Sequence, residues 1–184
     1  FTDIEELNPR TIIEYNLKTG RIEETRREFF SLMPQIKKEK EIIKKELSGL
    51  LVNAVAKRVP DEKVGLLFSG GIDSVVIAKT LKALGVNFTC YTAALKEKGL
   101  KKSDDLLWAR KAARTLGLKL KVKTVSLNEV EGYIKKIIPM VEDSNVVKVG
   151  VSLPFYIACE KAKEDNVRVI FSGLGSEELF AGYK

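Results

Sequence analysis

The sequence predicts an α/β protein with an open parallel sheet and helices on both faces. Short apolar runs, typical of buried strands, alternate with longer stretches whose apolar residues recur at helical spacing. Two of the apolar runs end in glycine-containing loops, Ser69–Ser74 and Ser172–Glu178, and each loop leads into a helix. The carboxyl ends of parallel strands share one edge of a sheet, so we expect the two loops to face one site.

The first segment is expected to form a β-hairpin. Residues 11–17 and 21–30 alternate in polarity as strands do, with Gly20 at the turn between them. A lone hairpin is only marginally stable, so this segment is interpreted as part of another unit. We therefore assign residues 1–34 to a hairpin remnant or linker and residues 35–184 to the principal domain.

The principal domain is expected to alternate strands and helices along its whole length, with right-handed crossovers between parallel strands. The expected elements are an amphipathic helix over 35–57, a strand over 64–68, a helix from Asp73 to Gly85, a strand over 86–93, a helix over 103–116, a strand over 118–125, helices over 128–138 and 153–164, and a strand over 167–171.

Composition limits the class of protein. With 184 residues and 45% hydrophobic content, the chain can bury one sizeable core. It lacks the run of about 18 apolar residues of a membrane span and the pattern of a signal peptide, so we expect a cytoplasmic protein. Cys90 and Cys159 are far apart and form no C-x-x-C pair, which favours two buried, inert thiols over a disulfide or zinc site.

The formal charge of +7 raises the question of RNA binding. Lysine pairs such as Lys37-Lys38 and Lys44-Lys45 are interleaved with glutamates, which is typical of solvated helix faces rather than of one basic stripe. Nucleic acid is therefore not an expected partner.

The loop Ser69-Gly70-Gly71-Ile72-Asp73-Ser74 carries the clearest chemical signal. The two glycines allow backbone N–H groups to converge on an anion, and the two serines add hydroxyl donors. A Walker loop is excluded because its spacing and lysine are missing. A carboxylate among phosphate-binding amides suggests a bridging divalent cation, so Asp73 is a candidate Mg²⁺ ligand. The alternative is a plain turn in which Asp73 or Ser74 caps the helix.

These residues resemble a known family. Ser69–Ser74 is similar to the S-G-G-x-D-S loop of the N-type ATP pyrophosphatases, which cleave ATP between its α and β phosphates. The segment from Phe171 to Tyr183 resembles S-G-E-G-A-D-E-L-F-G-G-Y, the second motif of asparagine synthetases. The resemblance implies an adenine nucleotide alpha-hydrolase-like fold and an asparagine synthetase-like, AMP-forming carbon–nitrogen ligase that uses ATP and Mg²⁺.

The resemblance also implies roles for individual residues. The main chain at Leu67 and Cys90 would contact the base and ribose, and Asp73 and Glu177 would share Mg²⁺. No catalytic residue is assigned. The implied ATP-binding residues are Leu67, Ser69, Gly70, Gly71, Asp73, Ser74, Cys90, Ser172 and Gly173.

This sequence departs from the family pattern at four points. Leu174 stands where asparagine synthetases have a glutamate, which puts aspartate in doubt, and Glu177 replaces a shorter aspartate. The family's pyrophosphate-binding lysine lies on a helix beyond Lys184, so the domain is expected to continue. The glutaminase cysteine of the family is also missing, which implies a separate glutaminase domain or subunit. The implied substrates are a small carboxylate, with aspartate as one candidate, and ammonia or an amine.

Two other functions remain open from the sequence. A tRNA-modifying ATP pyrophosphatase would carry the same first loop and would cleave ATP only with tRNA present. A non-catalytic ATP or AMP sensor could use the same scaffold, and Leu174 favours it.

Overall fold

The computed structural model describes residues 4–27, 37–96 and 104–180. The chain divides into two compact units, residues 1–45 and 46–184. The division falls inside helix α1 (Lys40–Ala56), so the boundary we drew between residues 34 and 35 stays a prediction.

The first unit contains the expected hairpin. Strands β1 (Thr11–Tyr15) and β2 (Ile22–Arg26) pair antiparallel, with Tyr15 opposite Ile22. Gly20 has φ +69° at the turn, a conformation that glycine adopts without strain. Both strands expose apolar side chains to the surface, and the assignment of the hairpin to another unit stays a prediction.

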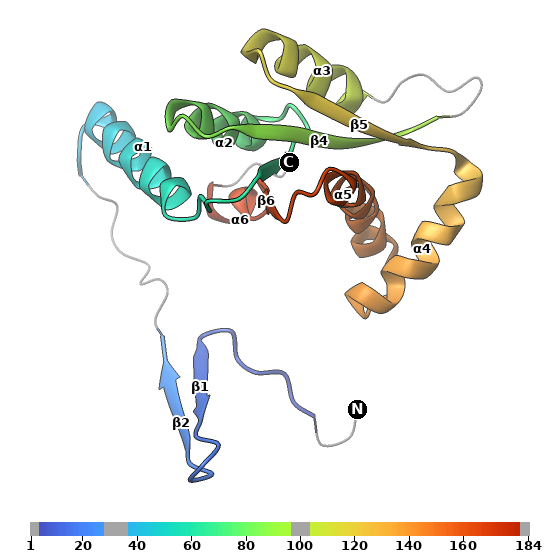
Figure 1. The fold of residues 1–184 in the computed structure, drawn as a ribbon. Helices are drawn as coiled ribbons and strands as arrows, with labels where there is room; N and C mark the ends of the chain where they lie inside the picture. The colour runs from blue at the N-terminus through green and yellow to red at the C-terminus, as the bar shows by residue number, and fades with distance from the viewer. Residues whose placement is uncertain (1–3, 28–36, 97–103, 181–184) are drawn as a thin grey trace. The chain divides into compact units, whose positions relative to one another are not determined.

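The second unit contains a four-stranded parallel sheet in the order β5-β4-β3-β6 (Figure 1). The crossovers between these strands are helical, which confirms the predicted α/β architecture. The strands are β3 (Val64–Leu67), β4 (Phe88–Leu95), β5 (Leu120–Val125) and β6 (Val169–Phe171).

Helices cover both faces of this sheet, as the sequence predicts. In Figure 1, α2 and α3 lie on one face, and α5 lies on the other. The helices after α1 are α2 (Ile72–Ala83), α3 (Asp104–Leu116), α4 (Leu127–Val141), α5 (Val146–Glu164) and α6 (Ser176–Phe180).

The core has two layers because consecutive strand residues point to opposite faces. On one face, Leu66, Phe68 and Cys90 are buried against small residues of α2 and α3. On the other face, Tyr91 is buried against Ala158 and Ala162 of α5. Alanines at these helix positions let the helices approach the sheet closely, which fixes where their ends lie at the sheet edge.

Two expectations about single elements were wrong. Helix α5 begins at Val146, seven residues before the predicted start at Leu153, because the Asn145 side chain accepts hydrogen bonds from the N–H groups of Val147 and Lys148. The expectation of two buried thiols also fails, because Cys159 is exposed, although both cysteines are free. In the described part of the chain, no helix combines the length and apolar character that crossing a membrane requires.

Candidate functional site

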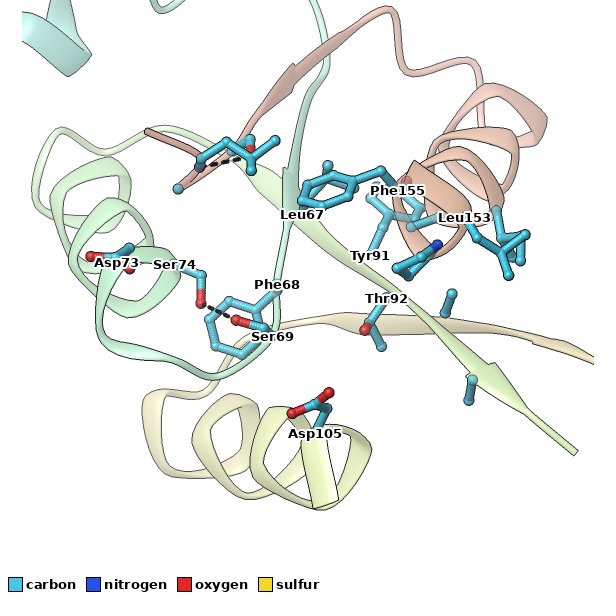
Figure 2. Close-up of a pocket in the computed structure, with 18 of the residues that line it drawn as sticks. Leu67, Phe68, Ser69, Asp73, Ser74, Tyr91, Thr92, Asp105, Leu153 and Phe155 are labelled. Carbon is cyan, nitrogen blue, oxygen red and sulfur yellow. Dashed lines mark hydrogen bonds between the residues drawn. The ribbon is translucent and has the colours of Figure 1, made fainter. Parts of the chain in front are cut away.

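A pocket of about 530 Å³ opens at the carboxyl edge of the parallel sheet. Its walls come from the ends of β3 and β4, the start of α2, the loop after β6 and the middle of α5. Figure 2 shows Asp73 and Ser74 on one side, Leu153 and Phe155 on the other, and Leu67 at the end of β3 between them. The pocket thus lies where the predicted loops emerge.

The first loop is shaped by one glycine with a left-handed backbone. Gly70 has φ +79°, and a Cβ there would lie 2.7 Å from the main-chain carbonyl of Trp108 and 2.8 Å from the amide of Ala109. The loop therefore rests directly on the backbone of α3. Gly71 differs, because its φ of −70° is open to any residue and it is the N-cap of α2.

The hydroxyls of this loop hold its own turn together. The amide of Gly71 donates to Ser69 Oγ at 3.2 Å, and Ser74 Oγ donates to the carbonyl of Gly71 at 3.0 Å. The alternative in which Asp73 or Ser74 caps the helix is wrong, because Gly71 is the N-cap and no side chain caps this helix end. Asp73, the second residue of α2, has no hydrogen-bond or ion-pair partner among the described residues.

The second loop contacts the first at its chemically important residue. A Cβ at Gly173 would lie 2.8 Å from the Cβ of Asp73 and 3.4 Å from the amide nitrogen of Ser74. Ser172 Oγ accepts a hydrogen bond from the amide of Leu174, and Ser176 Oγ donates to the carbonyl of Gly173. The structure therefore brings the two loops together.

The pocket offers two carboxylates that could hold a divalent cation. Asp73 and Glu177 both line it, and neither side chain is hydrogen-bonded or ion-paired within residues 4–27, 37–96 and 104–180. No group of three potential metal ligands occurs in that same part of the chain. Mg²⁺ commonly binds through one or two carboxylates and takes its other oxygens from substrate phosphates and water. The pair fits this chemistry.

Not every residue implied by the resemblance lines the pocket. The pocket is lined by Leu67, Ser69, Asp73, Ser74, Ser172, Gly173 and Glu177. Gly70 and Gly71 do not line it, but they shape the first loop. Cys90 is fully buried against α2 and α3, and its amide donates to the carbonyl of Lys119. Burial raises the pKa of the Cys90 thiol to about 12, so it stays protonated. Its role toward the base and ribose stays a prediction.

Sequence reasoning missed several pocket residues. Thr92 follows the buried Tyr91 on β4, and Asp105 lies in the first turn of α3, where a carboxylate normally only complements the helix dipole. Leu153 and Phe155 come from α5 and lie inside the span predicted for that helix, but no motif marked them as pocket residues. A signal for Thr92 was available, because it lies at the carboxyl end of a predicted parallel strand.

A polar cluster behind the pocket holds α5 against the sheet. Tyr91, which lines the pocket, donates from its hydroxyl to Asp165 Oδ2 at 2.8 Å, and Lys121 Nζ lies 2.6 Å from Asp165 Oδ1. Burial and the Asp165 carboxylate raise the pKa of Tyr91 to about 12. The Lys121 and Tyr91 donors lower the pKa of Asp165. This cluster ties the carboxyl end of α5 to β4 and β5.

Comparison with known proteins adds to this geometry. The sequence is 38% identical over 98% of the chain to a putative glutamine-hydrolyzing asparagine synthetase of Methanocaldococcus jannaschii, and 37% identical over 79% of the chain to the human asparagine synthetase. The chain spans 32% and 26% of the lengths of these two relatives. An NH3-dependent NAD synthetase from Campylobacter jejuni superposes on 80% of this chain and 62% of its own, with a TM-score of 0.46 and 20% identity. The family described as Asparagine synthase matches residues 46–184, more than half of the chain, and the chain therefore belongs to the asparagine synthase family.

Proposed function

We propose that this chain forms the ATP-binding part of an ATP-dependent amide-forming ligase that activates a carboxylate as an acyl-adenylate. A carboxylate oxygen attacks the α-phosphorus of ATP, and pyrophosphate leaves. Ammonia or an amine then attacks the acyl carbon, and AMP leaves with the bonding electrons. The observation that carries the proposal is the contact between the two loops, in which Gly173 lies against Asp73 at the start of α2.

The loop geometry supports the first step of this reaction. The amino end of α2 carries free backbone N–H groups and the positive end of the helix dipole, which stabilise phosphate oxygens. Asp73 and Glu177 would hold a Mg²⁺ ion, whose charge offsets the negative charge that develops on the departing pyrophosphate. Neither carboxylate is committed to another partner in the described part of the chain, so both are available.

The proposed source of ammonia is a separate glutaminase unit. The relatives at 37% and 38% identity are named as glutamine-hydrolyzing, and they are about three times as long as this chain or longer. The test uses the full-length protein with Mg·ATP, candidate carboxylates and either ammonia or glutamine. AMP, pyrophosphate and an amide should form together in equal amounts, and their absence with every carboxylate would refute the ligase.

A nucleotide sensor is a second candidate because one observation favours it. Leu174 lines the pocket next to the Ser172–Gly173 contact and brings no acid, base or hydrogen-bonding group. A sensor would bind ATP and AMP with similar affinity and release no pyrophosphate, whereas the ligase should bind Mg·ATP more tightly than AMP. Isothermal titration with both nucleotides separates these functions, and tRNA-stimulated ATP cleavage would instead indicate a tRNA-modifying enzyme.

A further inference from the structure

We propose that the outer side of helix α3 is a docking surface for an acidic segment of a partner protein, one that carries apolar side chains next to its carboxylates. This inference goes beyond the proposed ligase and does not depend on it. We call the surface the α3 outer face and define it by Leu107, Trp108, Arg110, Lys111 and Arg114. It is separate from the nucleotide pocket, because none of these residues lines the pocket.

Helix α3 turns one row of side chains to the sheet and another row away from it. The residues that pack on the sheet are buried and recur at helical spacing, and they are Leu106, Ala109 and Ala113. On the opposite side, Leu107, Lys111 and Arg114 follow the same spacing and form one row. In Figure 1, no other described helix or strand of the second unit lies over this side of α3. The row is therefore open to a partner.

The centre of the α3 outer face is apolar and exposed. Leu107 is 49% exposed and its neighbour Trp108 is 59% exposed. Lys111 Nζ lies 5.1 Å from the centre of the Trp108 ring, so a cation borders the apolar pair directly. Protein interfaces have this arrangement, with an apolar centre, a polar rim and binding energy that comes mainly from tryptophan, tyrosine and arginine.

The charged side chains of this face have one sign. Beyond its first turn, α3 carries cations and no acidic residue. The side chains of Arg110 and Arg114 form no hydrogen bond or ion pair with any other described residue. By contrast, Lys44 of α1 and Lys135 of α4 are each ion-paired with a glutamate of the same helix. Charge complementarity therefore favours a partner that brings carboxylates to α3.

A protein segment fits this face better than a nucleic acid does. Proteins that bind single strands combine a basic groove with aromatic rings on which bases stack. Here the face is the convex surface of a helix, and Lys111 lies over the Trp108 ring. Leu107 has no group that binds phosphate or stacks on a base, but it can pack against an apolar side chain of a peptide.

The first experiment titrates the full-length protein with three probes of equal length. They are an amphipathic peptide of leucine and glutamate at helical spacing, polyglutamate and single-stranded oligouridylate. Calorimetry should show the leucine–glutamate peptide binding at least ~10-fold more tightly than polyglutamate, because only the former covers the apolar centre. Trp108 emission should change in the same titration. Equal affinity for the two peptides, no binding of the leucine–glutamate peptide, or tighter binding of oligouridylate would each overturn the proposal.

A double charge reversal tests the basic rim. Arg110→Glu combined with Arg114→Glu should raise the Kd of the leucine–glutamate peptide by at least ~10-fold, because attraction becomes repulsion at two positions. The control combines Lys44→Glu with Lys135→Glu, which changes the net charge by the same amount on other helices and should leave this Kd unchanged. Equal weakening in the two double variants would show attraction to the net charge alone and would overturn the docking surface.

A matched pair of leucines tests the apolar centre. Leu107→Ser should lower the preference for the leucine–glutamate peptide over polyglutamate by at least ~5-fold. Leu127→Ser is the control, because Leu127 of α4 is also 49% exposed but lies outside the α3 outer face. The affinity for Mg·ATP should match that of the parent in both variants, since neither residue lines the pocket. An unchanged peptide preference in Leu107→Ser would overturn the assignment of α3.

Discussion

Gly173→Ala is the sharpest test of the contact between the two loops. The new Cβ would lie 2.8 Å from the Cβ of Asp73, a distance that real Cβ atoms essentially never show. The neighbour is the first carbon of a side chain on the rigid first turn of α2, so it cannot rotate away. The loops must separate by roughly half an ångström to relieve the overlap, at a cost of about 1–3 kcal/mol in stability.

The separation should weaken nucleotide binding as well as lower the stability of the fold. Mg·ATP would contact both loops, so displacing one of them should raise its Kd by at least ~10-fold, measured by titration calorimetry. Gly132→Ala is the control, because Gly132 lies in α4 with nothing within 4 Å of its Cβ position. The free energy of unfolding of that variant should rise by about 0.5–1 kcal/mol, and its nucleotide affinity should stay the same. A folded Gly173→Ala protein with unchanged Kd would show that the contact does not shape the nucleotide site.

Three further predictions concern side chains. Asp73→Asn and, to a similar extent, Glu177→Gln should each lower pyrophosphate release by at least about 100-fold without unfolding the protein; normal release from either variant would remove that residue from the metal site. Tyr91→Phe should lower the free energy of unfolding, measured by chemical denaturation, by about 1 kcal/mol, because the hydroxyl that donates to Asp165 is lost. An unchanged denaturation midpoint would refute this role. The pKa of Asp165 is lowered in the folded state, so its contribution to stability is complete above the unfolded value of about 4 and is lost as pH falls below it. Thermal unfolding should therefore show a smaller loss of stability on acidification in Asp165→Asn than in the parent, and equal losses would contradict it.

The alternation of strands and helices could be predicted because its signals are local. Buried strands need apolar residues on both faces, and helices end where glycine can take a left-handed backbone. Gly85 has φ +71° and Gly117 has φ +61°, and the helices before them stop as predicted. The first loop was also predictable, since Ser69–Ser74 fixes its own turn through its own hydroxyls.

The remaining features depend on tertiary contacts. The sequence around Gly150 and Pro154 favours a break, but α5 continues through both, because the Asn145 side chain caps its first turn and Val149 in that part of the helix is buried. Asp105 is separated from the first loop by more than thirty residues, and only the packing of α3 under that loop brings it to the pocket. Sequence spacing carries no information about such a contact.

The packing of Gly70 against the main-chain carbonyl of Trp108 provides an optical probe of this site. Trp108 is the only tryptophan in the sequence, the residue is 59% exposed, and Lys111 Nζ lies 5.1 Å from the centre of its ring. Indole emission responds to small shifts of nearby charge and solvent, and Gly70 of the loop packs directly on the peptide group that carries this ring. Fluorescence titration of the unlabelled protein should therefore follow occupation of the loop, and selective excitation of the indole over the five tyrosines makes Trp108 the one reporting position.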